Sequence, residues 1–259
     1  MPPPDPWNGG DWQLVAASVT GRAHELRGTG NQDAFAAATA ADGSLLLAVA
    51  DGAGSAARSA EGARAATEAA VACLAAGPPG GPEERLLTAF RQARSAVGRK
   101  AVRLGEPVRE FASTLLLVDV SAGSVNALQL GDGAVVIRNG DGVSRLTPPW
   151  RSLYAGETVF LTSPGAETQL QLTRRPLDGV DGIALLTDGL EPVATDLQSG
   201  APFPPFFEPL FTFAAAPATA RAGQALRNRE LAALLGSERI RNRTHDDTTL
   251  LLASVRTAA

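Results

Sequence analysis

The sequence predicts an α+β fold in which helices are layered over antiparallel sheets. Short apolar runs bounded by turn residues are typical of buried strands, and two such runs lie at 12–20 and 44–50. Two longer stretches rich in Ala, Leu, Arg and Glu follow at 55–76 and 83–104, and their composition and spacing favour helices. Because strands and helix pairs come in blocks and do not alternate one for one, the pattern does not indicate a parallel sheet built from βαβ units.

The second half of the chain is expected to be mostly strands. Four strand-like runs are divided by Ala-Gly, Gly-Asp-Gly and Asn-Gly-Asp-Gly turns, and we expect them to form one antiparallel meander. These runs are 113–120, 124–131, 133–138 and 143–147. Further strands are predicted at 157–162, 168–173, 181–187 and 248–255, with a helix near 219–236 and a Phe/Pro-rich stretch at 202–217.

Composition limits the class of protein. Of the 259 residues, 44% are hydrophobic and 19% charged, which is enough apolar material for a sizeable core and argues against disorder. We expect one domain over 12–259 after a flexible Pro/Gly-rich leader at 1–11. The net charge of −4 argues against nucleic acid and anionic membranes as partners. The single cysteine, Cys73, forms no intrachain disulfide, and no stretch resembles a secretory signal or membrane span, so a cytoplasmic location is expected.

Several aspartates share one placement, at the end of an apolar strand or in the tight turn beside it. Any one of them alone is better explained as ordinary Asp-Gly turn chemistry. Their repetition favours a different interpretation, because carboxylates that converge at strand ends suit hard divalent cations such as Mg²⁺ and Mn²⁺. The five residues are Asp33, Asp51, Asp132, Asp188 and Asp246.

The order of these motifs resembles the PPM or PP2C family of metal-dependent protein phosphatases. The segments that carry the resemblance are NQDAF, AVADGAGS, FASTLLLV, LGDGAVVIRNG, LLTDGLEPV and DDTTLLLA, and together they span about residues 12 to 255. Each motif alone is weak, but the ordered set is specific. The resemblance implies a four-layer α-β-β-α sandwich, in which two packed antiparallel sheets are flanked by helix pairs.

The resemblance also assigns roles to individual residues. It implies that Asp51 and the Gly52 carbonyl bridge two metal ions, and that Asp188 and Asp246 bind one of them. Asp132 matches the aspartate that helps to hold a third, more labile ion. The implied cofactor is Mn²⁺ or Mg²⁺, and the implied catalytic residues are Asp33, Asp51 and Asp188. Asp33 matches the aspartate that orders water at the metals.

Three positions depart from the family pattern. Gln32 stands where an acidic residue is usual; it is expected to order water beside Asp33 but to weaken metal binding. Gly28 stands where the family pattern has an arginine that binds the substrate phosphate. Arg27 is therefore the expected phosphate ligand, and Arg22 is the alternative. Ala53 follows the bridging Asp-Gly pair, where eukaryotic members often carry a histidine that donates a proton.

The resulting prediction is a cytoplasmic phosphatase that hydrolyses phosphoserine or phosphothreonine on proteins through a metal-activated water. Its partners would be substrates phosphorylated by a serine/threonine kinase. Two alternatives remain open: a binding module that kept the fold but lost activity, and a hydrolase of small phosphate esters. The two histidines, His24 and His245, are too far apart in sequence to form a local ligand pair and are expected to be polar loop residues, although His245 adjoins Asp246.

Overall fold

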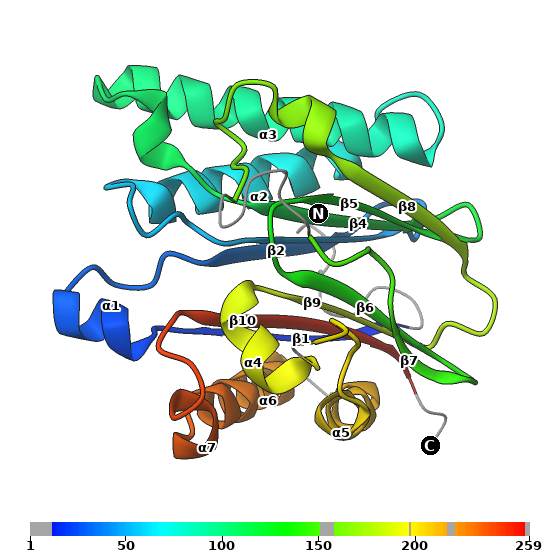
Figure 1. Cartoon of the computed structure of the whole chain (residues 1–259). Helices are drawn as coiled ribbons and strands as arrows, with labels where there is room; N and C mark the ends of the chain where they lie inside the picture. Colours follow the sequence, from blue (N-terminus) through cyan, green and yellow to red (C-terminus); the bar gives the residue numbers. More distant parts are fainter. Residues whose placement is uncertain (1–11, 151–157, 197, 217–220, 257–259) are drawn as a thin grey trace.

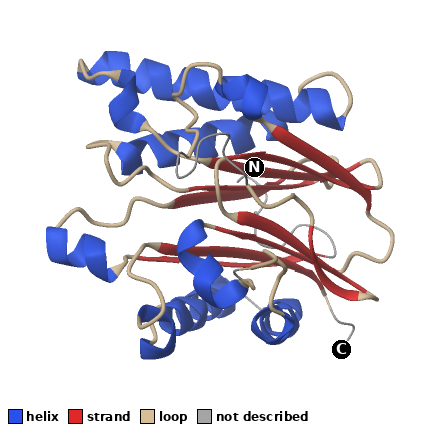
Figure 2. Ribbon diagram, viewed as in Figure 1, coloured by secondary structure: helices blue, strands red, loops and turns tan. Residues whose placement is uncertain are grey.

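The computed structural model describes residues 12–150, 158–196, 198–216 and 221–256. Two antiparallel five-stranded sheets lie face to face, and helices cover both outer faces (Figure 1). Figure 2 shows the resulting order of layers, helix, sheet, sheet and helix. The predicted α+β sandwich is therefore confirmed.

The first sheet has the strand order β2-β3-β4-β5-β8. Its strands are β2 (Ala34–Thr39), β3 (Leu45–Ala50), β4 (Leu115–Ser121), β5 (Ser124–Leu130) and β8 (Gln171–Pro176). Two long helices, α2 (Ser59–Ala75) and α3 (Pro82–Leu104), pack against its outer face. Helix α3 begins at Pro82 and is preceded by Gly81. Both residue types are favoured at these positions of a helix N-terminus.

The second sheet has the strand order β1-β10-β9-β6-β7. Its strands are β1 (Trp12–Val19), β6 (Ala134–Asn139), β7 (Gly142–Arg145), β9 (Gly182–Leu186) and β10 (Thr248–Val255). The helices α5 (Pro204–Ala215) and α6 (Arg221–Leu235) cover its outer face. Shorter helices complete the fold: α1 (Arg22–Arg27), α4 (Glu191–Ala194), α7 (Glu238–Arg241) and the 3₁₀ turns Val108–Phe111, Ala166–Gln169 and Asp188–Leu190.

The sequences of the central strands are unbroken apolar runs because both faces of these strands are buried. In β3, Leu46, Ala48 and Ala50 pack under α2 and α3. The alternate residues Leu47 and Val49 point the other way and meet side chains of the second sheet. Side chains alternate in the same way along the strands of the second sheet. Those on one face pack against the first sheet, and those on the other face pack against α5 and α6.

The predicted single meander is wrong in its second half. Strands β4 and β5 pair in the first sheet, but β6 and β7 pair in the second, so the chain crosses between sheets at Gly131-Asp132-Gly133. Gly131 (φ 84°) and Gly133 (φ 95°) both adopt left-handed conformations that favour glycine. A Cβ at Gly133 would lie 2.6 Å from the Leu186 carbonyl oxygen. The Gly-Asp-Gly segment is a crossing between layers, and it holds Asp132 at the edge of both sheets.

Other predictions differ in detail. Residues 158–162 contain no strand, and the strand expected at 168–173 begins later, at Gln171, after a 3₁₀ turn. The Phe/Pro-rich stretch contains helix α5, which begins with two prolines at positions that tolerate them and buries Phe207 and Phe211. The predicted leader, 1–11, lies outside the described residues. Within the described part of the chain, no helix combines the length and apolarity needed to cross a membrane.

Candidate active site

The predicted aspartates lie around one edge of the sheet pair, where strands of both sheets end. Asp51 directly follows β3 of the first sheet, and Asp188 follows β9 of the second. Asp132 lies in the crossing between the sheets. A carboxylate oxygen from each of these three residues lies within 4.8 Å of the other two. Strand ends far apart in sequence therefore bring three carboxylates together.

The carboxyl groups repel one another in a buried setting. Burial raises the pKa of Asp51 to about 11, and the charges of Asp33, Asp188 and Asp132 add to the shift. Burial, followed by the charges of Asp132 and Asp246, raises the pKa of Asp188 to about 7. Such a cluster is stable as carboxylates only beside positive charge, which is the condition that a bound dication meets.

Asp33 is held by one of its two oxygens. Thr187 Oγ1 (2.8 Å) and Thr249 Oγ1 (2.7 Å) both donate hydrogen bonds to Asp33 Oδ2. Asp33 Oδ1 is buried and has no hydrogen-bond partner among the described residues. Burial raises the pKa of Asp33 to about 7 although the two threonine bonds lower it. The threonines orient this carboxylate so that one oxygen is left for the site.

The backbone at Asp51-Gly52 is fixed by the neighbouring segment 113–114. The Asp51 N–H donates to Thr114 Oγ1 (2.9 Å), and the Thr114 N–H donates to the Asp51 carbonyl (2.8 Å). Gly52 forms an isolated antiparallel bridge with Ser113. A Cβ at Gly52 would lie 2.6 Å from the Gln32 carbonyl oxygen, so only glycine fits there.

Gln32 and Asp132 complete this part of the site. Gln32 is only 7% exposed, and its Oε1 atom has no partner among the residues that the structure describes. That oxygen lies 4.0 Å from the place where a Gly54 Cβ would be. Asp132 Oδ2 accepts a hydrogen bond from Thr158 Oγ1 (2.8 Å).

A pocket of about 260 Å³ opens beside these carboxylates. It is lined by Ala23, His24, Arg27, Asp51, Gly52, Gly54, His245 and Asp246. Arg27 is therefore at the pocket wall. Arg22 faces α7 instead, where its guanidinium lies 3.3 Å from Glu238 Oε1. The Arg241–Glu25 ion pair also joins α1 to α7, so α1 is anchored where it presents Arg27.

His24 differs from the sequence-based expectation of a polar loop residue. It lies in α1 with its side chain only 8% exposed, and its Nδ1 atom is 2.8 Å from Asp247 Oδ2. The Asp247 carboxylate accepts hydrogen bonds from the backbone N–H groups of Gly21 (2.7 Å) and Gln32 (2.6 Å), whereas the His24 Nδ1 atom lies close to it without forming one. Gly28, where the family arginine was expected, ends α1 in a left-handed conformation (φ 68°).

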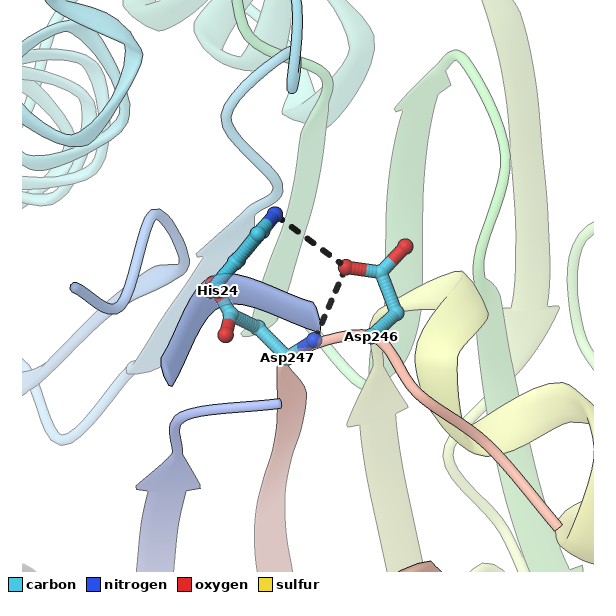
Figure 3. A group of neighbouring side chains, drawn as sticks. All are labelled: His24, Asp246 and Asp247. Carbon is cyan, nitrogen blue, oxygen red and sulfur yellow. Dashed lines mark hydrogen bonds and ion pairs between the residues drawn. The ribbon is translucent and has the colours of Figure 1, made fainter. Parts of the chain in front are cut away.

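Sequence reasoning gave Asp247 no role. The doubled acid at 246–247 was the only available signal, and it does not reveal which carboxylate points inward. In the structure the Asp247 side chain is 1% exposed and contacts Gly21, His24 and Gln32, whereas the Asp246 side chain is half exposed and lines the pocket. Figure 3 shows the Asp246 carboxylate facing His24.

The residues present fit a divalent metal centre. The donors are mainly carboxylate and carbonyl oxygens, which hard cations prefer, and the two buried oxygens without a partner, on Gln32 and Asp33, belong to the same site. Gly52 lines the pocket beside Asp51. This arrangement can hold cations and, through Arg27, an anionic group beside them.

The chain matches known proteins along most of its length. Residues 20–236 match the family model described as protein phosphatase 2C. Serine/threonine-protein phosphatase 3 of Escherichia coli K12 is 33% identical over 253 residues, which cover 93% of this chain and 98% of that protein.

Solved structures share the fold. The catalytic domain of the serine/threonine phosphatase PstP, solved with two manganese ions, has a TM-score of 0.64 at 23% identity, covering 95% of this chain and 99% of that one. Stp1 from Staphylococcus aureus has a TM-score of 0.63 at 15% identity, covering 96% and 97%. The family match, the curated relative and the shared fold agree with the order of the aspartate motifs, and the chain belongs to the protein phosphatase 2C family.

Proposed function

We propose that this protein is a metal-dependent phosphatase that hydrolyses phosphoserine and phosphothreonine in protein substrates. The observation that carries the proposal is the convergence of Asp51, Asp132 and Asp188, with oxygens within 4.8 Å of one another, in a protein phosphatase 2C fold. The name of the Escherichia coli relative supports the same class of substrate.

The proposed metal ligands are Asp51, the Gly52 carbonyl, Asp188 and Asp246, with Asp132 at a third ion. The ions would be Mn²⁺ or Mg²⁺, and the two manganese ions of the PstP structure support a pair. When bound, such ions supply an activated water nucleophile and neutralise charge on the phosphoryl group. The raised pKa values of Asp51 and Asp188 support this assignment, because a bound cation offsets both the burial and the repulsion that raise them.

Three residues position substrate and water in this proposal. Arg27 lines the pocket and offers a planar guanidinium that suits phosphate oxygens. Asp33 Oδ1 and Gln32 Oε1 have no partner among the described residues and are free to accept hydrogen bonds from water. Ala53, which is buried beside Ala56 and Ala112, has a methyl side chain and therefore has no proton to donate to the leaving group.

The proposal extends to the cellular setting. The substrates would be products of a serine/threonine kinase, because such kinases make the esters that this site would hydrolyse. We place the reaction in the cytoplasm, since the lone cysteine makes no disulfide within the chain. The inactive-module alternative is disfavoured because all five aspartates are present.

The test is hydrolysis of an aryl phosphate and of phosphoserine and phosphothreonine peptides, with added Mn²⁺ or with chelator. We expect activity only with the metal, and loss of it in Asp51→Asn and Asp188→Asn. Asp141→Asn, in the exposed β6–β7 turn, is the matched control and should keep full activity. Activity in chelator, or in either folded site variant, would refute the metal mechanism. Sugar and nucleotide phosphates as preferred substrates would favour the small-ester alternative.

A further inference from the structure

We propose that His24 is a nitrogen ligand of the metal centre, so that this chain binds a first-row divalent transition metal through an imidazole as well as through oxygens. The inference rests on the metal centre of the proposed function. It assigns to His24 a role that no aspartate motif predicts.

The first observation is where His24 points. It lies in α1 and lines the same pocket as Asp51, Gly52 and Asp246. Its Nε2 atom is 3.9 Å from Asp246 Oδ1, and Figure 3 shows the imidazole and this carboxylate facing each other. That separation is too long for a hydrogen bond. It is compatible with two ligands of one ion, since each ligand atom lies about 2.0–2.2 Å from such a metal.

The second observation is what lies on the other side of the ring. Nδ1 is 2.8 Å from Oδ2 of Asp247, a carboxylate whose side chain is 1% exposed. Two backbone N–H groups, from Gly21 and Gln32, donate to the same carboxylate and hold it in place. The carboxylate therefore occupies the Nδ1 side of the ring, and Nε2 is the nitrogen on the side of Asp246 and the pocket. Histidine ligands of metals commonly have a carboxylate beside the ring nitrogen that does not bind the metal.

A third, independent observation comes from Gln32. This side chain is more than nine-tenths buried, and its Oε1 atom has no partner in the described part of the chain. The oxygen approaches Gly54, which is itself part of the pocket wall. Gln32 thus leaves a neutral oxygen without a partner beside the wall of the pocket that His24 lines.

The chemical consequence concerns the choice of metal. Imidazole nitrogen binds transition metals well, whereas Mg²⁺ prefers oxygen ligands and retains water. Loss of His24 should therefore weaken Co²⁺ and Mn²⁺ binding more than Mg²⁺ binding. Even outer-shell partners of metal ligands change affinity by about 10–100-fold, so we expect at least about a tenfold loss for Co²⁺.

The direct test is electron spin echo envelope modulation of the full chain loaded with Mn²⁺. The chain has two histidines, and both line the pocket, so His245 is a matched control. We expect coupling from a coordinated imidazole nitrogen in the wild-type protein and in His245→Gln, and its loss in His24→Gln. Coupling that persists in His24→Gln, or that is missing from the Mn²⁺-loaded wild type, would overturn the proposal.

A second measurement does not depend on the folding of His24→Gln. In the His245→Gln protein, His24 is the only histidine left, so labelling with ¹⁵N-histidine should replace the ¹⁴N modulation by ¹⁵N modulation. Unchanged modulation would overturn the assignment. Calorimetric titration with Co²⁺ and Mg²⁺ then gives the change in selectivity. Mn²⁺ binding and hydrolysis without nitrogen coupling would refute this inference alone, whereas failure to bind Mn²⁺ would refute the proposed function as well.

Discussion

Asp51 is the residue whose charge the fold tolerates least without a cation. Its pKa is raised to about 11 from the usual 3.8, and those of Asp33 and Asp188 are raised to about 7, chiefly by burial. The unfolded chain releases these protons near pH 4, whereas the folded protein retains them. The folded state therefore binds more protons above that pH, and stability falls as the pH rises.

We therefore expect the metal-free protein to be less stable at pH 7 than at pH 5. Asp51→Asn should reduce this loss, because the amide does not ionise, and saturating Mn²⁺ should also reduce it. Urea unfolding in chelator at pH 5, 6 and 7 measures the effect. The control Asp141→Asn should follow the wild type. A metal-free protein that gained stability over this range would contradict the electrostatic account.

Gln32 provides a second test at the residue scale. Its amide oxygen is buried at the site but carries no charge. In Gln32→Glu the added carboxylate should lower the Mn²⁺ concentration for half-maximal activity by roughly tenfold, because opposite charges attract strongly at short range. The exposed Gln92→Glu on α3 is the matched control. Equal values for Gln32→Glu and the wild type would mean that this position has no electrostatic effect on the metals.

The two candidate arginines can be distinguished kinetically. Arg27 lines the pocket, whereas Arg22 forms an ion pair with Glu238 and donates a hydrogen bond to Asn242. Arg27→Ala should raise the KM for an aryl phosphate by about tenfold or more, since a charge-assisted contact contributes about 1.5–3 kcal/mol. Arg22→Ala should change KM much less, because it removes a contact between α1 and α7. The reverse result would assign the phosphate to Arg22.

At the scale of the elements, alanine substitutions at two helical glycines should have opposite effects on stability. A Cβ at Gly62 in α2 would lie 2.1 Å from the Phe111 carbonyl oxygen, whereas a Cβ at Gly98 in α3 would meet nothing within 4 Å. Gly98→Ala should stabilise the protein by about 0.5–1 kcal/mol. Gly62→Ala should destabilise it by roughly 1–3 kcal/mol, because overpacking outweighs helix propensity.

Urea unfolding of the two variants under one condition measures this difference. Both substitutions change the same residue type in a long helix, so intrinsic propensity cancels in the comparison. Equal effects would mean that α2 shifts away from Phe111 without cost. The expected result would show that Gly62 is required for close packing of α2 against the Val108–Phe111 turn.

For the whole molecule, the proposed metal centre joins the two sheets. Asp51 comes from the first sheet, and Asp188 and Asp246 come from the second. A ligand that binds only the folded state stabilises it by about 2.7 kcal/mol at 100 times its Kd. We expect saturating Mn²⁺ to raise the Tm by roughly 5–10 °C for a chain of this size.

Calorimetry or circular dichroism, with Mn²⁺ and then with chelator, measures this shift. Asp51→Asn should lose most of it, whereas Asp141→Asn should keep it. A Tm that does not respond to Mn²⁺ in the wild type would argue against a metal centre that joins the sheets.

Local sequence patterns predict much of the fold. The apolar runs at β3, β4 and β10 predict strands because these strands are buried on both faces, and the Ala-rich stretches predict α2 and α3. The order of the aspartate motifs predicts the family, and each aspartate lies at the strand end or turn where it was expected. Such features depend on residues close together in the chain.

Only the tertiary structure decided which distant segments meet. The turn at Gly131–Gly133 reads as a hairpin, but it carries the chain to the other sheet because β6 pairs with β9, about fifty residues later. The orientations of His24, Arg27 and Asp247 were equally undetermined, since each depends on α1 packing beside the segment that precedes β10. Local pattern encodes whether a segment is a helix or a strand; which partner it contacts is set by packing across the whole core.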